Sequence, residues 1–254
     1  MKDEIYHERS LDVAGSVGIV DIDNGRASKL VYDAIDQIAQ ITGAHSETRR
    51  VTGWYRNKGK RLADLAIVIG TLPLTGLITL LCALALWLEG GQPFYRQNRL
   101  GRGGRQFSIL KLRTMSCDAD ELLEEYLSSD PAMRAEWDTT QKLKNDPRIT
   151  TIGAILRSTS LDELPQLWNV IKGDMSVVGP RPMMPDQLAF YANPRAYFGL
   201  RPGMTGAWQV SDRNENSFAH RSTVDTRYNA KLSFWSDLWI LCQTAGVIVR
   251  RTGY

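Results

Sequence analysis

The chain has 254 residues, with 31 Lys and Arg against 28 Asp and Glu, which gives a formal net charge of +3. This length predicts one domain of roughly 150–200 residues with appended segments. Residues 1–48 hold nine acidic and four basic residues, a net charge of −5, so the remainder carries +8. A basic body suits anionic partners such as phospholipid head groups or phosphorylated substrates. The three cysteines are far apart, which argues against a disulfide framework or a structural metal and fits the reducing cytoplasm.

Residues 1–48 are interpreted as an N-terminal extension that holds no candidate catalytic group. Its apolar residues are sparse except at Ser28–Ile41, where near-helical spacing predicts a short helix. We expect this extension to be mobile or regulatory. The first apolar run begins some sixty residues into the chain, so no signal peptide is expected.

An uncharged run, LAIVIGTLPLTGLITLLCALALWL, extends from Leu65 to Leu88. It reaches the roughly 20 residues that a helix needs to cross a bilayer, and few buried helices of soluble proteins are apolar on every face for so long. Pro73 removes a backbone donor near its middle, so a kink is expected. Residues 49–61 and 90–113 each carry six Lys or Arg and no acid, and the positive-inside rule assigns both flanks to the cytoplasm. Residues 49–94 are therefore predicted to form a re-entrant membrane helix, with a straight span as the alternative.

Residues 95–254 form the predicted catalytic domain. Alternating apolar and basic positions within Gly90–Met115, on both sides of a Gly-Arg-rich turn, predict short strands. The basic positions, Lys111 and Arg113 among them, are either a solvated face or contacts to anionic lipid or substrate. Ser116–Asp146 is acidic and helical in character and is interpreted as a surface insertion. Ser233–Arg251 predicts a helix that is either an ordinary core helix or one lying in the membrane interface, because its aromatic residues and terminal arginines fit both.

The acidic pair Asp162-Glu163 lies in the stretch STSLDELPQLWNVIKGDMSVVGPRP. Ser160 followed by Glu163 matches a capping box, so Glu163 could serve only as a helix cap. Pro165 favours Asp162 as the N-cap, because a proline at the third helical position loses no hydrogen bond. In both cases the carboxylates lie at a helix N-terminus, which stabilises negative charge and attracts phosphate.

An arginine between two prolines follows the predicted buried strand MSVV. Pro180 and Pro182 restrict the backbone around Arg181 and permit a cis bond, and the planar guanidinium suits a phosphate. Arg201 and Arg213 head or end two further loops and are candidate phosphate ligands. A metal at such a site should be Mg²⁺, held by a carboxylate and substrate phosphates rather than by a protein cage.

Several motifs between Lys60 and Tyr254 resemble those of the bacterial sugar transferases, the monotopic phosphoglycosyl transferases that begin exopolysaccharide and glycan assembly. They are KRLAD, YRQNRLG, FSILKLRTM, NDPRIT, LRSTSLDELPQLWNVIKGDMSVVGPRP, RPGMTG and WQVSDRN. The resemblance covers about three quarters of the chain. It implies transfer of a sugar-1-phosphate from a nucleotide diphosphate sugar to undecaprenyl phosphate, with Mg²⁺, at the inner face of the cytoplasmic membrane, and a membrane helix broken near a proline.

The resemblance also implies roles for individual residues. Asp162 would be the nucleophile and a metal ligand, Glu163 its catalytic partner, and Arg181 a phosphate ligand. The expected phosphate or substrate ligands are Lys111, Arg113, Arg157, Arg181, Arg201 and Arg213, and the expected structural prolines are Pro73, Pro180 and Pro182. The sequence departs from the usual pattern at Leu72, where serine is common, and at Asp212, where glycine is usual.

The sequence thus predicts a mostly helical α/β protein: a re-entrant membrane helix plus a small catalytic domain with interfacial amphipathic helices. The expected reaction moves galactose- or glucose-1-phosphate from its UDP-sugar to undecaprenyl phosphate and releases UMP. Membrane phospholipid is an expected partner, and downstream glycosyltransferases and self-association remain open. A catalytically silent scaffold for polysaccharide assembly is the alternative. A nucleic-acid-binding protein is disfavoured, because the apolar run is present and no helix-turn-helix or aromatic-basic sheet motif is found.

Overall fold

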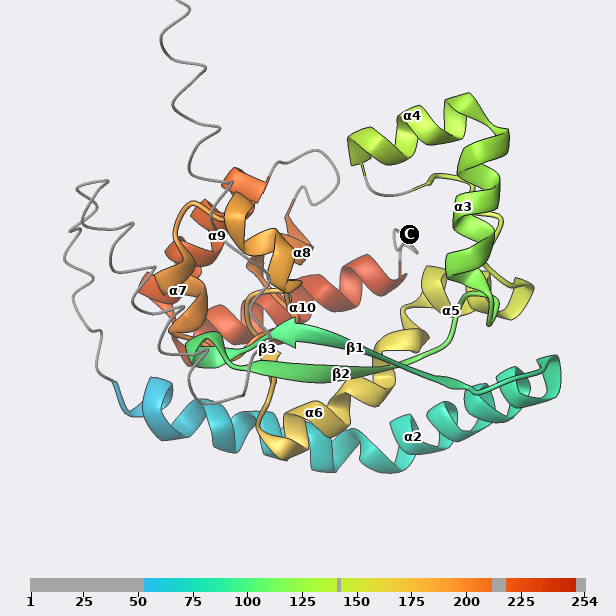
Figure 1. The fold of residues 1–254 in the computed structure, drawn as a ribbon. Coiled ribbons are helices and arrows are strands. Elements are labelled where there is room, and N and C mark those ends of the chain that lie inside the picture. Colours follow the sequence, from blue (N-terminus) through green and yellow to red (C-terminus); the bar gives the residue numbers. More distant parts are fainter. Residues whose placement is uncertain (1–52, 141–142, 212–217, 250–254) are drawn as a thin grey trace, which may run out of the picture.

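A computed structural model of the chain describes residues 53–140, 143–211 and 218–249. The described part is mostly helical with two small two-stranded sheets, which confirms the predicted class at that level. Helix α2 runs along one side of the molecule, the hairpin of β1 and β2 lies beside it, and α3 and α4 project as an arm (Figure 1). The predicted helix at residues 28–41 and the whole extension 1–48 lie outside the described residues.

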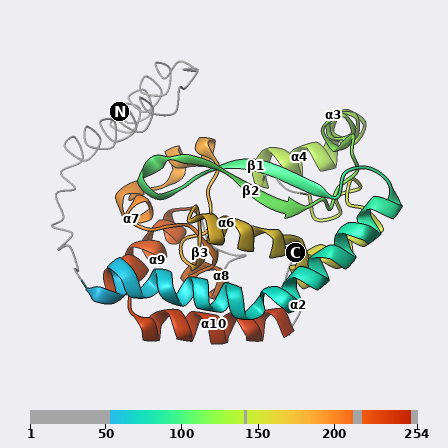
Figure 2. The ribbon, with the colours of Figure 1, turned by 90° about the horizontal axis from the view of Figure 1, so that it is seen from below.

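Helix α2, Lys60–Glu89, is the longest element and follows a short π-helix, η1, at Tyr55–Gly59. Pro73 lies inside it; the helix continues through this residue and bends (Figure 2). Together η1 and α2 are long and apolar enough to cross a membrane, and only 6% of the most apolar window is buried in the protein. The exposed apolar face of such a helix requires an apolar environment.

The predicted strands form an antiparallel hairpin. Strand β1, Phe94–Leu100, pairs with β2, Gln106–Leu112, in a register that sets Phe94 opposite Leu112 and Leu100 opposite Gln106. The connection contains a 3₁₀ turn, η2, at Arg102–Gly104, where Gly103 and Gly104 have φ values of 71° and 75°. Glycine adopts this left-handed conformation without the steric cost that other residues incur.

The rest of the chain consists of short helices around a second, parallel sheet. The insertion is helical, as predicted, and MSVV forms strand β3, which pairs with β4. In chain order the remaining elements are α3 Ala119–Ser129, α4 Pro131–Thr140, α5 Thr151–Thr159, η3 Leu161–Gln166, α6 Leu167–Lys172, β3 Ser176–Val178, η4 Pro185–Phe190, α7 Pro194–Phe198, β4 Gly203–Thr205, α8 Ala207–Val210, α9 Phe218–Lys231 and α10 Phe234–Val249.

Both halves of α2 pack against this body. Val68, fully buried, belongs to a core cluster with Ile109 of β2, Val170 of α6 and Ile240 of α10. Toward the other end, Ala83 and Leu86 form a second cluster with Leu112 and Leu156. Each fully buried aliphatic side chain contributes about 1.5–3 kcal/mol, so the helix is held to the domain at two separate places.

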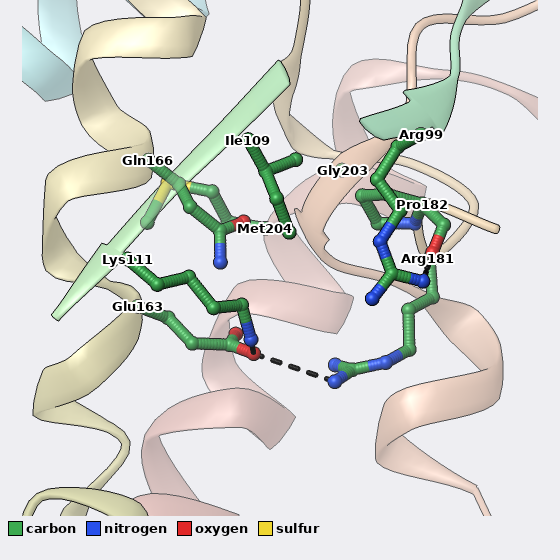
Figure 3. Close-up of a pocket in the computed structure, with 9 residues that line it drawn as sticks. All are labelled: Arg99, Ile109, Lys111, Glu163, Gln166, Arg181, Pro182, Gly203 and Met204. Carbon is green, nitrogen blue, oxygen red and sulfur yellow. Dashed lines mark hydrogen bonds and ion pairs between the residues drawn. The ribbon is translucent and has the colours of Figure 1, made fainter. Parts of the chain in front are cut away.

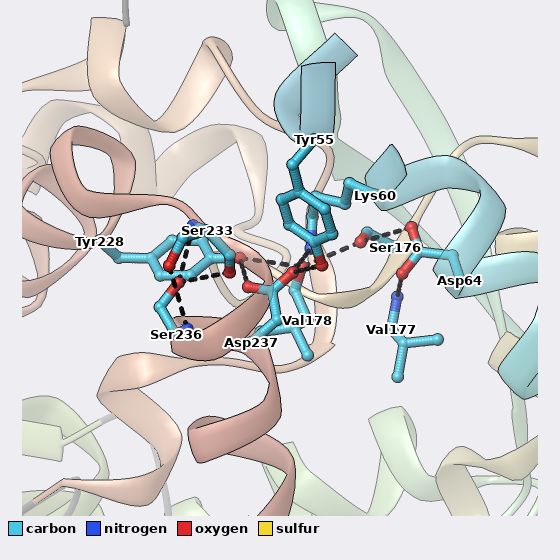
Figure 4. A network of polar contacts seen from close by, with 10 residues as sticks. All are labelled: Tyr55, Lys60, Asp64, Ser176, Val177, Val178, Tyr228, Ser233, Ser236 and Asp237. Carbon is cyan, nitrogen blue, oxygen red and sulfur yellow. Dashed lines mark hydrogen bonds and ion pairs between the residues drawn. The ribbon is translucent and has the colours of Figure 1, made fainter. Parts of the chain in front are cut away.

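A buried polar network fixes the N-terminal end of α2 (Figure 4). Asp237 of α10 accepts hydrogen bonds from Tyr55 Oη at 2.7 Å, Lys60 Nζ at 2.6 Å and Tyr228 Oη at 2.6 Å. One turn along α2, Asp64 accepts from Ser176 Oγ at 2.8 Å and from a backbone amide of β3 at 3.0 Å. Buried charges need such partners, because an unpaired ion in the interior is strongly destabilising.

Candidate active site

The acidic pair sits in the first turn of η3, directly after α5. Ser160 ends α5 in the left-handed conformation, with φ of 57°, and the chain then turns into η3. Neither capping arrangement suggested by the sequence is present. Ser160, not the favoured Asp162, is the N-cap residue of η3, and no side chain caps this N-terminus. The backbone amide of Glu163 donates instead to the carbonyl of Ser160 at 3.3 Å. Asp162 and Glu163 are therefore free of a capping role, and the left-handed serine directs them away from the axis of α5.

Two cations face the acidic pair. Lys111 Nζ lies 2.7 Å from Glu163 Oε1 and 3.9 Å from Asp162 Oδ2. Arg181 Nη2 lies 3.3 Å from the same oxygen of Glu163 (Figure 3). The side chain of Asp162 is 13% exposed, so it is largely shielded. Of the two acidic residues, Glu163 is the one that lines the adjacent pocket.

Strand β2 presents Lys111 because α6 fixes the strand from the side. Asn169 accepts a hydrogen bond from the amide of Leu110 at 3.1 Å and donates to the carbonyl of Ser108 at 2.9 Å. One side chain of α6 thus satisfies two backbone groups of the strand. The lysine that follows is held over η3, where the two carboxylates begin.

The surroundings of the two carboxylates shift their pKa values in opposite directions. Burial raises the pKa of Asp162 above its ordinary value; Lys111 opposes this shift and the charge of Glu163 adds to it. Burial would also raise the pKa of Glu163, but the ion pairs with Lys111 and Arg181 outweigh it and lower that pKa to about 2. Burial therefore opposes the stabilisation of negative charge that the N-terminus of η3 is expected to give Asp162.

Arg181 is held by its backbone. Pro180 is fully buried, and the described residues contain no cis peptide bond, so both prolines are trans. Arg221 of α9 donates a hydrogen bond from Nη2 to the carbonyl of Arg181, and its guanidinium lies 5.4 Å from the ring centre of Trp208. These contacts fix the backbone position of Arg181, from which its side chain extends to Glu163.

A pocket opens between the hairpin, η3 and β4. Its walls include Lys111, Glu163 and Arg181, together with Arg99, Gln166 and Met204 (Figure 3). Arg99 is partly buried, and burial together with the nearby charge of Arg181 lowers its pKa to about 10. The floor is tightly built, because a Cβ on Gly203 would lie 2.1 Å from the backbone nitrogen of Gly179. Three cations, Arg99, Lys111 and Arg181, against one carboxylate, Glu163, make this pocket suited to a multiply charged phosphate.

Comparison with known proteins shows the family to which this sequence belongs. The sequence profile described as Bacterial sugar transferase matches residues 55–251. The chain belongs to the bacterial sugar transferase family.

Its relatives differ in length. The UDP-galactose-lipid carrier transferase of Erwinia amylovora is 50% identical over 197 residues, which are 76% of this chain and 41% of that protein. The undecaprenyl-phosphate galactose phosphotransferase of Salmonella typhimurium is 44% identical over 195 residues, again 76% and 41%. The exopolysaccharide production protein ExoY of Rhizobium meliloti is 45% identical over 196 residues, 76% of this chain and 87% of that protein. The chain thus spans less than half of the first two relatives.

The structure brings some of the expected ligands of this bacterial sugar transferase together and separates others. Lys111 and Arg181 contact the acidic pair. The charge of Arg157 lowers the pKa of Asp162, and its Nε donates a hydrogen bond to Oγ1 of Thr114 at 2.8 Å. Arg113 is tied to the end of α2 instead, 3.2 Å from the carbonyl of Leu86.

The other two expected arginines lie elsewhere. Arg201 lines a second cavity, with its Nε 2.9 Å from the carbonyl of Gly173. Arg213 lies outside the described residues. Arg99, Gln166 and Arg221 were not among the expected residues. Arg99 lies in the motif YRQNRLG, which is the signal that could have indicated it, whereas Arg221 lies in none of the motifs.

The donor set of this transferase limits how a metal could bind. Within the described residues no group of three or more His, Cys, Asp or Glu side chains converges. Glu163 is already paired with two cations, which leaves the carboxylate of Asp162. A single carboxylate fits Mg²⁺ that keeps its water and takes its other ligands from substrate phosphates, and it does not fit an ion held in an all-protein cage.

Proposed function

We propose that this protein transfers a sugar-1-phosphate from a UDP-sugar to undecaprenyl phosphate and releases UMP. The observation that carries the proposal is the partly shielded carboxylate of Asp162 next to Glu163. Glu163 in turn forms ion pairs with Lys111 and Arg181. Two relatives, a UDP-galactose-lipid carrier transferase and an undecaprenyl-phosphate galactose phosphotransferase, indicate the substrate classes. UDP-galactose and UDP-glucose are the proposed donors, the second because a further relative is a UDP-glucose:undecaprenyl-phosphate transferase.

The proposed chemistry has two steps. An oxygen of Asp162 attacks the phosphorus that bears the sugar, the bond from that phosphorus to the bridging oxygen breaks, and UMP leaves with the electron pair. The lipid phosphate oxygen then attacks the same phosphorus, and the Asp162 carboxylate is restored. Arg181, Arg99 and Lys111 neutralise the charge on the diphosphate. Mg²⁺, held by Asp162 and the substrate phosphates, would supply further charge neutralisation.

Glu163 has a different proposed role. A carboxylate with a pKa of about 2 is a poor general base near neutral pH. An arriving diphosphate competes for Lys111 and Arg181, and the loss of these partners raises the pKa of Glu163. Glu163 therefore holds the two cations in place before the donor arrives and becomes a better proton acceptor afterwards, when the lipid phosphate attacks.

The membrane arrangement belongs to the same proposal. Helix α2 re-enters the cytoplasmic leaflet without crossing, and the catalytic domain faces the cytoplasm at the inner membrane. Exposed aromatic residues of α10, Phe234, Trp235 and Trp239, lie in the interface and contact phospholipid. The active-site pocket then stands at the depth where a lipid phosphate and a soluble nucleotide can meet.

Trapping the first half-reaction tests the proposal. Purified protein given UDP-galactose without lipid acceptor should release up to one equivalent of UMP and gain the mass of a hexose phosphate on the peptide that contains Asp162. Asp162→Asn keeps the shape and removes the nucleophile, so UMP release should fall by several orders of magnitude. The matched control is Asp118→Asn, an exposed aspartate whose side chain caps nothing, and it should leave the rate unchanged.

Two outcomes would overturn parts of the proposal. If UMP appears only when lipid phosphate is also present and no adduct forms, the transfer is direct and Asp162 is at most a metal ligand. If no UDP-sugar in a panel yields UMP with either acceptor condition, the protein is a silent scaffold.

A further inference from the structure

A second cavity lies at the tip of the hairpin. It has a volume of about 550 Å³ and is bounded by the hairpin turn, the end of α6 and the segment that leads into β4. Its walls share no residue with the active-site pocket. A space of this size accommodates a head group or a nucleotide phosphate, so it is more than a packing defect.

The walls are strongly positive. Arg102 and Arg105 project from the hairpin turn and Arg201 from the loop before β4. The one acidic residue of the lining, Asp174, is already paired with Lys172 at 3.0 Å. The charges of Arg102 and Arg61 act on Arg201 and, together with burial, lower its pKa. Arginines that repel one another across a cavity without matching carboxylates favour an anion between them.

The backbone leaves room for a ligand to approach. Gly101 and Gly103 line the cavity from the hairpin turn, and Gly173 lines it from the end of α6. Gly173 has a φ of 90°, so its own conformation already favours glycine. The cavity thus combines glycine backbone and guanidinium groups, which suit oxygen-rich anions, with the two aromatic residues Phe107 and Phe198.

The cavity also lies near the membrane helix. Arg61, in the first turn of α2, donates to the carbonyls of Val170 at 2.5 Å and Ile171 at 2.8 Å, at the end of α6. The basic flank of α2 gives way there to exposed apolar residues such as Leu62 and Ile69. A basic site at such a boundary is where the phosphate of an anionic lipid is found.

We propose that this second cavity, formed by Arg102, Arg105 and Arg201, binds a phosphate group that is not the one transferred in the reaction. The phosphate comes either from the head group of an anionic phospholipid or from a soluble nucleotide. The inference does not depend on the proposed transferase activity, because it concerns a separate set of residues.

Arginine labelling at residue resolution tests this proposal. The full chain is placed in nanodiscs and treated with phenylglyoxal, and modification of Arg102 and Arg105 is followed by mass spectrometry. One arm compares phosphatidylglycerol with phosphatidylcholine discs, and another adds UDP to phosphatidylcholine discs. Slower labelling in phosphatidylglycerol identifies the lipid as the source, and slower labelling with UDP identifies the nucleotide. Equal labelling in all conditions overturns the proposal.

A variant series separates binding from nonspecific shielding. Arg201→Gln removes one guanidinium contact, so the ligand concentration needed for half-protection should rise about tenfold. Arg201→Lys keeps the charge and should lose less. Arg227→Gln, an exposed arginine of α9, carries the same charge change at a distance and should behave as the wild type. If Arg227→Gln weakens protection as much as Arg201→Gln, the effect is one of net charge and the site does not exist.

Discussion

Asp162 and Glu163 are adjacent in the chain, yet their surroundings push their pKa values in opposite directions. Burial raises the pKa of Asp162, and the pair of cations lowers that of Glu163 to about 2. Two carboxylates separated in this way serve as different groups in one reaction. A carboxylate that is less well solvated is also a stronger nucleophile, because less hydration must be removed before it attacks.

The pH dependence of the first step should report the environment of Asp162. The nucleophile must be ionised, and its raised pKa places the acidic limb of the UMP-release profile above that of an exposed aspartate. Lys111 lowers the pKa of Asp162, so Lys111→Met should move this limb to still higher pH as well as slow the reaction. Single-turnover UMP release, measured from pH 4 to 9, checks this.

The matched control for that series is Lys231→Met, which removes an exposed lysine at the end of α9. It should leave the acidic limb where it is in the wild type. A limb that stays in place in Lys111→Met as well would mean that another group controls the observed ionisation.

The residues found from the sequence share one property, which is that they lie in contiguous motifs. Asp162, Glu163 and Arg181 could be predicted because a single stretch carries them. Arg99 lies in the motif YRQNRLG, but the sequence does not show that it lines the pocket. The isolated Arg221 of α9 could not be predicted, because it meets Arg181 only after the chain has folded. The alternating basic pattern that predicts the hairpin does not say which cations face the site, and for this reason Lys111 and Arg113 are predicted together although only Lys111 contacts the acidic pair. A rigid loop headed by an arginine is equally uninformative about direction, and Arg201 lines the other cavity.

At the scale of elements, α2 shows both the strength and the limit of sequence reasoning. The uncharged run from Leu65 to Leu88 predicts an apolar helix of about this length with Pro73 inside it. The contacts of its N-terminal end could not be predicted, because they depend on Asp237 and Tyr228, which lie more than a hundred residues away in the chain. Those contacts turn a generic apolar helix into one joined to the catalytic domain.

Removing the shared acceptor should detach this end of α2. Asp237→Ala leaves Lys60 buried without its counter-ion, so unfolding free energy should fall by about 3–5 kcal/mol. Chemical unfolding in detergent measures this loss. The control Asp138→Ala breaks an exposed pair with Arg134, whose side chains are 53% and 58% exposed, and it should cost under about 1 kcal/mol.

A double variant examines the cause of that loss. Lys60→Met with Asp237→Leu removes both buried charges, so it should recover much of the stability lost in Asp237→Ala. If the double variant is no more stable than Asp237→Ala, the hydrogen bonds from Tyr55 and Tyr228, rather than the ion pair, hold this end of the helix.

At the scale of the whole molecule, the two attachment points of α2 bear on its membrane topology. Val68 shares a core cluster with Ile109, and Leu86 shares one with Leu112. Ile109 and Leu112 are both in β2, about 10 Å apart at the rise of a strand. Val68 and Leu86 lie 18 residues apart in the continuous helix α2, which is about 27 Å along its axis. A helix that crossed the bilayer over this length would draw the domain packed along it into the hydrocarbon core, and this supports the proposed re-entrant arrangement.

Cysteine accessibility tests this topology. After the native cysteines Cys82, Cys117 and Cys242 are replaced by serine, single cysteines are placed at Asn57 and Gln92, which are both exposed and flank the apolar helix. We expect an impermeant thiol reagent to label neither in intact cells, because both basic flanks remain in the cytoplasm. Both should react in inverted membrane vesicles, which shows that lack of labelling reflects sidedness and not burial. Labelling of one position from outside would establish a spanning helix, and the contacts of α2 with α6, β3 and η3 would then have to break in the membrane.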